Sequence, residues 1–231
     1  MGRWTLTVES AIRGNDIHEP ETGLICLENT HNRAGGAIVP VSNMEAVYKV
    51  AKENQVPVHL DGARLFNAAV AERKLVKDYT QYTSTVQICL SKGLGAPVGS
   101  IIAGSESFIE KARKWRKRLG GGLRQAGVLA APGIIALTDM VERLEDDHIH
   151  AKRLANGIRN IEGLSVINKV DTNIILVDTS EKGLSSKVYI ERLKEKGVRA
   201  VSFGPTTVRL TTHHQVTKEQ IDKVLFVMQG I

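Results

Sequence analysis

Short apolar runs alternate with helical patterns along the first hundred residues of the chain. The runs at 23–27, 56–60 and 86–90 are apolar enough for buried strands, and each ends in polar residues. Helical patterns occupy 42–54 and 63–71, between the runs. The order strand, helix, strand, helix, strand predicts a largely parallel sheet with the helices as crossovers.

The pattern changes after the third predicted strand. An apolar run at 98–103 follows within a few residues. Because a parallel crossover needs a dozen residues or so, we expect this strand to be antiparallel. A basic helix at 111–118, a glycine break at 120–122 and a long alanine-rich helical region at 125–159 are predicted next.

The last third of the chain combines short strands with helices. Strands are predicted at 173–177, 198–202 and 207–211, with a helix at 187–196. This mixture is typical of a small α+β domain. We place its boundary with the α/β domain near residue 140, which divides the chain into 1–140 and 141–231.

Two sequences fit the capping box, in which a Ser or Thr and a Glu or Gln three residues later satisfy each other's backbone N–H groups. Ser42 and Glu45 predict the start of the first crossover helix. Thr217 and Gln220 predict the start of the last helix.

The composition is that of an ordinary soluble globular protein. Of 231 residues, 42% are hydrophobic and 24% are charged, while only 4% are aromatic, so the core must be built from aliphatic side chains. The net charge of +6 favours anionic partners, such as a phosphate-bearing cofactor, without indicating nucleic acid. No stretch is long and apolar enough for a membrane span and no secretory signal is recognisable, so we expect a cytoplasmic protein.

The two cysteines each lie in an apolar run. We expect Cys26 and Cys89 to be buried free thiols in a reducing compartment. Their spacing is not that of zinc ligands, and no His-x-x-x-His pattern or carboxylate cluster indicates a metal site.

Polar residues cluster after three predicted parallel strands, at 28–31, 61–64 and 91–92. Ligands of open α/β sheets bind at the carboxyl ends of the strands. Asp61 and Lys92 end successive strands, so both can face one crevice. A lysine amine that forms a Schiff base, with a carboxylate that keeps a pyridine nitrogen protonated, is the pair that pyridoxal 5'-phosphate (PLP) needs. The spacing leaves open a solvated loop lysine and a turn-forming aspartate.

Four ordered motifs resemble those of the low-specificity L-threonine aldolase family. Residues 59–68 resemble its Asp-Gly-Ala-Arg motif, and residues 89–100 resemble its cofactor-lysine motif. Segments 27–32 and 120–127 are also similar to the family. The resemblance runs from about residue 11 to the C-terminus.

This resemblance implies a PLP-dependent lyase of the aspartate aminotransferase-like fold type I. Such an enzyme cleaves L-threonine or L-allo-threonine to glycine and acetaldehyde, in threonine catabolism and glycine biosynthesis. The chain would then hold an incomplete, mostly parallel large domain and a C-terminal α+β small domain. The resemblance further implies a homodimer or homotetramer that needs no metal and binds neither nucleic acid nor membrane.

The resemblance assigns most of the cofactor contacts to residues of the larger domain. Lys92 would form the Schiff base with PLP, and Asp61 would pair with the pyridine nitrogen. Arg64 would lie near the cofactor's phenolic oxygen and the substrate. Lys117 and Arg124 match basic residues that reach the cofactor phosphate, across a subunit interface.

Two further residues would act on the substrate. Arg209 matches the arginine that grips the substrate carboxylate, a task that suits the guanidinium fork. His18 matches a histidine near the substrate hydroxyl, where it or a water it holds would serve as the base. The plainer alternatives are an outward strand arginine and an exposed loop histidine; for Arg64 and Lys117 they are surface positions on helices. We expect His31 to satisfy its own turn rather than to carry protons.

Family members are longer at the N-terminus than this chain. The Gly/Ser/Thr loop for the PLP phosphate and the histidine that stacks on the ring have no counterpart here, and residues 1–10 do not resemble the family. We therefore identify the chain as an N-terminally truncated member. Two alternatives to an active aldolase stay open. One is a catalytically impaired subunit partner, and the other is a nucleic-acid binder that uses the basic helix at 111–118.

Overall fold

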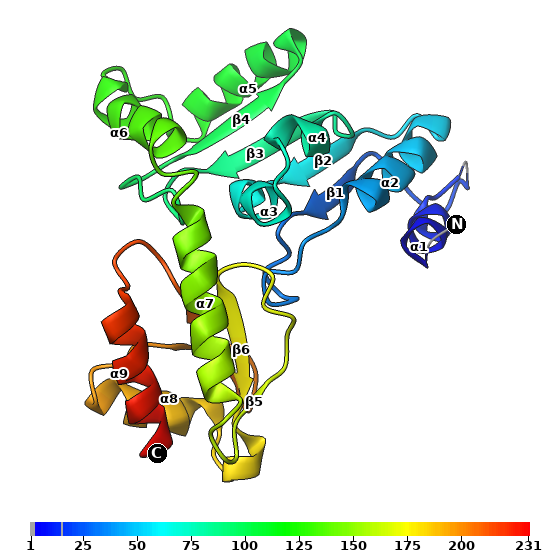
Figure 1. Ribbon diagram of the computed structural model, residues 1–231. Helices are drawn as coiled ribbons and strands as arrows, with labels where there is room; N and C mark the ends of the chain where they lie inside the picture. The colour runs from blue at the N-terminus through cyan, green and yellow to red at the C-terminus, as the bar shows by residue number, and fades with distance from the viewer. Residues whose placement is uncertain (1–2, 15) are drawn as a thin grey trace. The chain divides into compact units, whose positions relative to one another are not determined.

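The computed structural model describes residues 3–14 and 16–231, which form two compact units (Figure 1). Unit 1 comprises the chain up to Thr30 together with Val39–Met140. Unit 2 comprises Val141–Ile231 together with the short segment His31–Ile38. Among the described helices, none is both long and apolar enough to cross a membrane.

Unit 1 is built on a four-stranded sheet with the order β1-β2-β3-β4. Its strands are β1 (Ile25–Glu28), β2 (Val58–Asp61), β3 (Thr85–Cys89) and β4 (Ser100–Gly104). The first three strands are parallel and β4 is antiparallel to β3, which confirms the predicted sheet and the predicted reversal.

Helices precede, connect and follow these strands (Figure 1). They are α1 (Arg3–Ala11), α2 (Val41–Glu53), α3 (Leu65–Glu72), α4 (Val76–Thr80), α5 (Glu106–Arg118) and α6 (Gly127–Thr138). The capping box predicted at Ser42 is wrong. The Pro40 carbonyl already accepts the backbone N–H groups of Asn43 and Met44, so Ser42 lies inside the first turn.

Two further helix boundaries differ from the prediction. Helix α5 begins at Glu106 rather than 111, because the Ser105 side chain accepts the Phe108 N–H at 3.3 Å and caps the helix there. The region 125–159 is two helices rather than one. Helix α6 ends at Thr138, and α7 (Leu144–Ile158) begins unit 2 after a series of turns.

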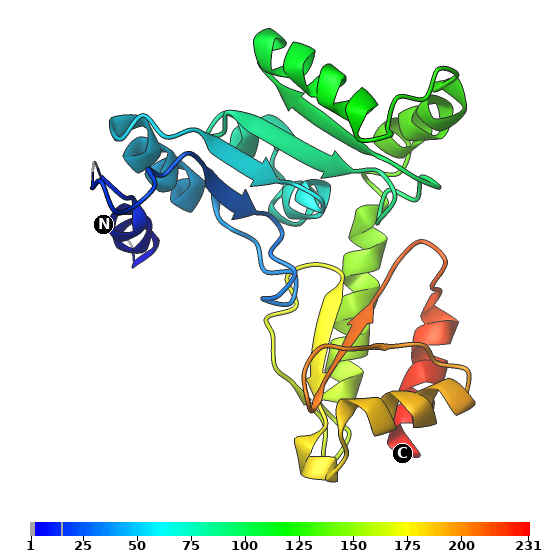
Figure 2. The same ribbon diagram turned by 180° about the vertical axis from the view of Figure 1, so that it is seen from behind.

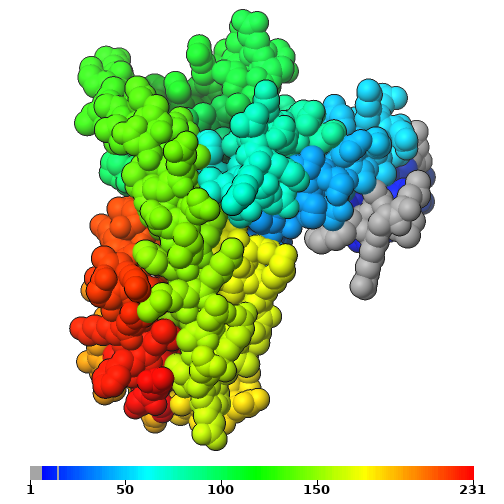
Figure 3. Space-filling view, in the orientation of Figure 1, coloured from blue at the N-terminus to red at the C-terminus, as the bar shows by residue number. Residues whose placement is uncertain are grey.

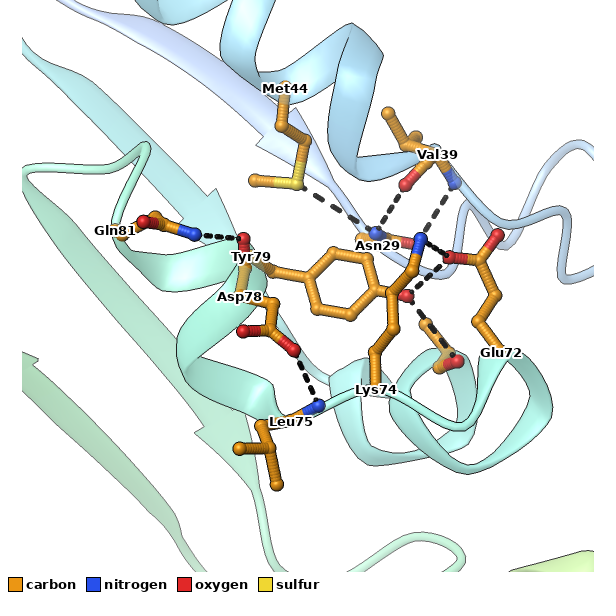
Figure 4. A network of polar contacts seen from close by, with 10 residues as sticks. Asn29, Val39, Met44, Glu72, Lys74, Leu75, Asp78, Tyr79 and Gln81 are labelled. Atoms are coloured by element: carbon orange, nitrogen blue, oxygen red, sulfur yellow. Dashed lines mark hydrogen bonds and ion pairs between the residues drawn. The ribbon is translucent and has the colours of Figure 1, made fainter.

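The core of unit 1 lies on the helical side of its sheet. Leu60 of β2, Met44 of α2 and Tyr79 of α4 are fully buried. The Tyr79 hydroxyl donates to Glu72 Oε2 at 2.8 Å, and burial together with that carboxylate raises the pKa of Tyr79 (Figure 4). In the same view, the amide of buried Asn29 exchanges two hydrogen bonds with the Val39 backbone, at 3.0 and 3.1 Å. Asn29 thereby links the two parts of unit 1 that flank the segment His31–Ile38, which belongs to unit 2.

The other face of the unit 1 sheet is open except where α5 lies beside β4. Strand register places Cys26 beside His59, and Asp61 beside Gln87, on the face opposite buried Leu60. Helix α5 lies on this face beside β4, where Phe108 approaches Gly104 and Thr85. Cys26 of β1 is exposed and Cys89 is only partly buried. The prediction of buried thiols is therefore wrong, although both cysteines are free.

Unit 2 contains an antiparallel sheet with the order β5-β6-β8-β7. Its elements after α7 are β5 (Ser165–Val166), β6 (Ile174–Asp178), η1 (Ser180–Lys182), α8 (Ser186–Glu195), β7 (Val201–Ser202), β8 (Thr207–Thr211) and α9 (Lys218–Gln229). Figure 2 shows β6 and β8 side by side in the unit, and Figure 3 shows α7 and α9 adjacent on its surface. The capping box of Thr217 and Gln220 is confirmed by reciprocal bonds of 2.9 and 3.3 Å.

The core of unit 2 is closed between its sheet and its helices. Leu154, Ile175, Leu193 and Ile221 come from four different elements and are at most 3% exposed. The segment His31–Ile38 packs on this unit. Its Gly36 has φ +76°, and a Cβ there would lie 2.8 Å from the Thr172 hydroxyl oxygen, so only glycine fits.

Candidate active site

Asp61 and Lys92 lie at the carboxyl ends of neighbouring parallel strands. Asp61 is the last residue of β2, and Lys92 follows the end of β3 by three residues. Lys92 is fixed in a turn, because its carbonyl accepts the Gly95 N–H at 3.0 Å and the Leu90 carbonyl accepts the Ala96 N–H at 3.0 Å. Both side chains are exposed. The fold therefore brings the two groups to one edge of one sheet.

The carboxylate of Asp61 is oriented by its neighbours. Its Oδ1 accepts the Ala63 N–H at 3.0 Å. With the Gln87 amide turned so that its nitrogen faces Asp61, that nitrogen donates to Oδ1 at 3.1 Å and the amide oxygen accepts the Cys89 N–H at 3.3 Å. Both donors use the same oxygen, which leaves Oδ2 to accept a further N–H from a ligand.

The backbone beside Asp61 approaches β3 closely. The Gly62 N–H donates to the Gln87 carbonyl at 2.7 Å. A Cβ at position 62 would lie 2.8 Å from that carbonyl oxygen, so a side chain there would push the two strand ends apart. Glycine at this position therefore keeps Asp61 and Gln87 adjacent.

Lys92 differs from Asp61 in having no fixed polar partner. Within the described parts of the chain, its amine makes neither a hydrogen bond nor an ion pair. An exposed amine on a fixed turn, at the edge that also carries a carboxylate, is available to react with a carbonyl group.

Arg64 lies three residues after Asp61, at the start of α3. It is the N-cap residue of that helix, and its carbonyl accepts the Asn67 N–H at 3.0 Å. Its side chain is half-buried, whereas Leu65 beside it is fully buried. Arg64 is thus near Asp61 in sequence, at a position that the start of α3 fixes.

Two of the predicted basic residues come from the end of α5 and from the loop that follows it. Lys117 is in the last turn of α5 and Arg124 is in the loop before α6, and both are exposed. The loop folds back on α5, since the Gly121 N–H donates to the Arg116 carbonyl at 2.8 Å. A Cβ on Gly122 would come within 2.3 Å of Lys117 Cδ, so the lysine stem lies against a bare glycine. Their role towards a cofactor stays a prediction.

His18 lies in an exposed stretch of unit 1. Its ring Nδ1 is 2.9 Å from Asp16 Oδ1, and its backbone N–H donates to the same oxygen at 2.8 Å. These two bonds lower the pKa of Asp16. Among the described residues, His18 makes no hydrogen bond to another predicted site residue, and its role as a base also stays a prediction.

Arg209 is the predicted site residue of unit 2, and it has a well-defined setting. It lies in the middle of β8 and is half-buried. Its Nη1 donates to Asn32 Oδ1 at 2.8 Å, and its guanidinium carbon lies 5.2 Å from the centre of the Phe203 ring. The other guanidinium near this ring, that of Arg33, lies 5.0 Å from the ring centre.

The guanidinium of Arg209 retains an unmet donor. Its Nε is buried, and no acceptor reaches it within the part of the chain that the structure describes. A buried N–H without an acceptor costs about 1–3 kcal/mol, and an anion that accepts it would recover that cost. Arg209 is thus held in place by an amide and an aromatic ring, while its buried Nε lacks an acceptor among the described residues.

Sequence reasoning missed the residues that orient the site. Gln87, Asn32 and Phe203 were not singled out. A signal existed for Gln87, which is polar within an otherwise apolar strand. None existed for Phe203, because its partner Arg209 lies six residues further along the chain, on β8. The structural role predicted for His31 is confirmed, because its Nδ1 accepts the Ala34 N–H at 3.1 Å. Over the described residues, no cluster of three or more His, Cys, Asp or Glu could hold a metal.

Comparison with known proteins places these features in a family context. The model of the family described as beta-eliminating lyase matches residues 5–182. A probable low-specificity L-threonine aldolase 2 of Arabidopsis thaliana is 44% identical over 97% of this chain and 64% of its own length. The low specificity L-threonine aldolase of Escherichia coli K12 is 41% identical over 94% of this chain and 62% of its own length. The chain therefore spans less than two thirds of each relative.

A solved structure confirms the fold that the motifs implied. The threonine aldolase of Leishmania major superimposes with a TM-score of 0.78 over 98% of this chain and 66% of its own. The sequence identity is 18%, so this likeness concerns the arrangement of strands and helices alone.

Proposed function

This chain belongs to the beta-eliminating lyase family, and on that premise we propose that it works as a PLP-dependent carbon–carbon lyase. The substrates would be L-threonine and L-allo-threonine, and the products glycine and acetaldehyde. The observation that carries the proposal is the placement of Lys92 and Asp61 at the ends of adjacent parallel strands. The name and the 44% identity of the Arabidopsis relative support the choice of substrate.

The residues present fit the cofactor in the chemistry of their donors. PLP needs an amine for its aldehyde and a carboxylate for its pyridine nitrogen. Lys92 offers an exposed amine, and Asp61 offers a carboxylate whose Oδ1 is already held by the Ala63 N–H. Asp61 and Gln87 lie side by side on the sheet face opposite Leu60, and the side chain of Asp61 is exposed to an approaching ligand.

The groups of unit 1 would hold the cofactor. When bound, PLP supplies an electron sink for the pair of electrons released at the substrate α-carbon. The Lys92 amine would bond to the cofactor aldehyde and yield that position to the substrate amine. Asp61 would keep the pyridine nitrogen protonated. Arg64 would donate to the cofactor's phenolic oxygen and to the substrate.

Two other side chains would act on the amino acid itself. Arg209 would bind the substrate carboxylate with the donors that Asn32 and Phe203 leave available. His18, directly or through a water it holds, would accept the proton of the β-hydroxyl group. This proton must leave as the Cα–Cβ bond breaks, because the hydroxyl oxygen becomes the aldehyde oxygen. Its partner Asp16 would stabilise the imidazolium that results.

The proposal extends to assembly and location. Lys117 and Arg124 would reach the cofactor phosphate of a neighbouring subunit in a homodimer or homotetramer. Exposed apolar residues of unit 1 support such an assembly, among them Ile101, Ile102 and Val128, which are 42–70% exposed. We place the enzyme in the cytoplasm, in threonine catabolism and glycine biosynthesis, without nucleic-acid or membrane partners.

The direct test is an assay for acetaldehyde. Purified chain is incubated with PLP and either L-threonine or L-allo-threonine, and the aldehyde is measured through a coupled NADH-consuming reductase. We expect steady acetaldehyde release that Lys92→Ala and Lys92→Arg both abolish, because arginine keeps the charge but cannot bond the cofactor. Lys114→Ala, an exposed lysine of α5, serves as the matched control and should retain activity.

The opposite result has a clear meaning. If the folded wild-type chain releases no aldehyde above the Lys92→Ala background, the aldolase proposal is wrong for this chain. Persistent self-association without activity would then favour a catalytically impaired subunit partner.

A further inference from the structure

A cavity of about 440 Å³ opens within unit 2, and none of its lining residues is proposed for catalysis. It is lined by residues of α7, the turn after α8, the end of β8 and α9. Leu210 lines it, and Leu210 follows Arg209 directly in β8. Because successive side chains of a strand point to opposite faces, the cavity lies on the face of β8 opposite Arg209. Neither Asn32 nor Phe203 contributes to its lining.

The polar part of the lining is basic. It contains Arg199, Lys223 and His213 but no aspartate or glutamate. Over the described residues, neither Arg199 nor Lys223 has a hydrogen-bond or ion-pair partner. The carboxylate next to Lys223 in sequence, Asp222, is engaged by Arg153 in contacts of 2.6–2.9 Å. Unbalanced positive charge around a concave surface attracts anions.

His213 adds an imidazole ring to this group. Its Nδ1 accepts the Gln215 N–H at 3.3 Å, so the ring hydrogen of neutral His213 resides on Nε2. The ring also packs edge-on against His214, with centroids 6.1 Å apart. These two contacts fix the ring of His213 at the cavity wall.

The rest of the lining combines a buried aliphatic wall with the neutral polar residues Thr211, Thr212, Gln215 and Gln220. Leu154, Leu210 and Ile221 are at most 5% exposed and form its buried part, while Val216 and Val224 are partly buried. The lining contains no aromatic ring other than that of His213, so a nucleotide base would find little to stack on. Inorganic phosphate would meet the cations but leave the aliphatic wall in water. The volume lies at the lower end of the range for small-molecule sites.

We propose that this cavity binds a small aliphatic carboxylate, a molecule with one anionic head and a short hydrocarbon body. Arg199 and Lys223 bind the carboxylate, and the aliphatic wall covers the hydrocarbon. Such a ligand contacts both β8 and α9. Because it binds the folded state and not the unfolded state, it stabilises unit 2. The site is independent of the proposed lyase chemistry, since it shares none of the lyase's proposed residues.

Three probes separate the contributions of charge and hydrocarbon. Hexanoate carries both features, 1-hexanol carries the hydrocarbon alone, and inorganic phosphate carries the charge alone. Each is titrated into the full ¹⁵N-labelled chain at fixed ionic strength, and backbone amide shifts are followed. We expect hexanoate to shift the amides around Arg199, Ile221 and Lys223, with an affinity at least about tenfold above that of either other probe.

Charge variants test the assignment of the head group. Arg199→Gln combined with Lys223→Gln should weaken hexanoate binding by about tenfold or more, because two charge-assisted bonds are lost. Both residues are exposed, so the amide spectrum of the double variant should remain that of the folded protein. The matched control is Lys218→Gln, an exposed lysine of α9 outside the cavity, which should bind hexanoate as the parent does.

Each alternative outcome overturns the proposal. If phosphate binds as tightly as hexanoate, the aliphatic wall has no role and the surface merely collects anions. If hexanol matches hexanoate, or the double variant retains full affinity, the basic residues do not define the site. Because amide shifts are read rather than turnover, failure here is distinguishable from failure of the lyase proposal.

Discussion

The two units of this protein differ in how completely they cover their sheets. In unit 2, Ile174, Ile175 and Val177 of β6 are fully buried, so helices and loops close the sheet on both faces. In unit 1, all five residues of β4 are exposed, and Ile101 retains 42% of its accessible surface. The sheet of unit 2 is covered on both faces, whereas the sheet of unit 1 is partly exposed.

This difference bears on the site residues that each unit carries. Arg209 extends from the closed sheet, and Asn32 and Phe203 fix its orientation before any ligand arrives. Lys92 and Asp61 lie at the edge of the open sheet, where Lys92 has no polar partner among the described residues. The group that we propose for carboxylate binding is therefore preorganised, whereas the groups that we propose for cofactor binding would depend on the ligand for their final contacts.

The sharpest way to break the comparison is to remove a side chain from each sheet region. Leu193→Ala deletes a fully buried side chain of unit 2 and should lower the free energy of unfolding by about 3 kcal/mol. Ile102→Ala, at a position on the Gln87 face of the unit 1 sheet that is 42% exposed, should cost under about 1 kcal/mol. Urea unfolding followed by circular dichroism measures both. Equal costs would show that the two sheets are equally well covered.

A pH titration tests the closure of unit 2 next. Burial, aided by the charge of Lys152, lowers the pKa of His148 to about 4. An unfolded histidine titrates near 6.5, so the unfolded state binds more protons between these values. The free energy of unfolding therefore has its full value above about pH 6.5 and decreases as the pH drops towards 4. We expect a loss of about 2 kcal/mol between pH 7 and pH 5.

Two histidine variants identify the source of that loss. His148→Gln should remove most of the pH dependence, whereas His214→Gln, at an exposed position nearby, should leave it intact. The measurement is again urea unfolding, repeated across the pH range. An unchanged slope in His148→Gln would contradict the closed environment assigned to that residue.

The preorganisation of Arg209 predicts a smaller, kinetic effect. Asn32→Ala removes the amide that holds the guanidinium, and the KM for threonine should rise about tenfold with little change in kcat. Phe203→Leu should raise the KM only a few-fold, because the cation–π contact that it removes is partly exposed to solvent and therefore weak. Initial rates over a range of threonine concentrations separate the two constants. A fall in kcat at constant KM would mean that Asn32 acts on the reaction and not on substrate binding.

The smallest effect belongs to the surface of unit 2. Arg153 and Asp222 join α7 to α9 through a bidentate ion pair, but both side chains are more than 40% exposed. Solvent screening limits such a pair to below about 1 kcal/mol. A double-mutant cycle with Arg153→Ala and Asp222→Ala should give this coupling, decreasing with added salt. A larger, salt-insensitive coupling would show that the helix surface is less solvated than its exposure indicates.

The same comparison explains which features the sequence could predict. Apolar runs and their spacing were sufficient for the parallel order of β1 to β3 and for the reversal at β4, because both follow from local periodicity and loop length. They also placed Asp61 and Lys92 at one sheet edge. They failed for Cys26, since an apolar run does not reveal which face of a strand is covered.

Contacts between distant segments were beyond the sequence. The bond from Arg209 to Asn32 spans 177 positions, and Asn168 reaches back to the Gly35 carbonyl across 133. No local pattern encodes such a pairing, so the transfer of His31–Ile38 to unit 2 could not be foreseen. The cavity beside Arg199 and Lys223 is of the same kind, because its walls come from four separate elements.

The central claim is that Lys92 and Asp61 form a PLP site, and an absorbance titration tests it most directly. PLP is added to the wild-type chain, Lys92→Ala, Asp61→Asn and the control Lys114→Ala, and the visible band of lysine-bound cofactor is recorded. We predict a saturable band at one PLP per chain in the wild type and the control, weakened in Asp61→Asn and absent in Lys92→Ala. No band in the wild type, or a band that survives Lys92→Ala, would contradict the account.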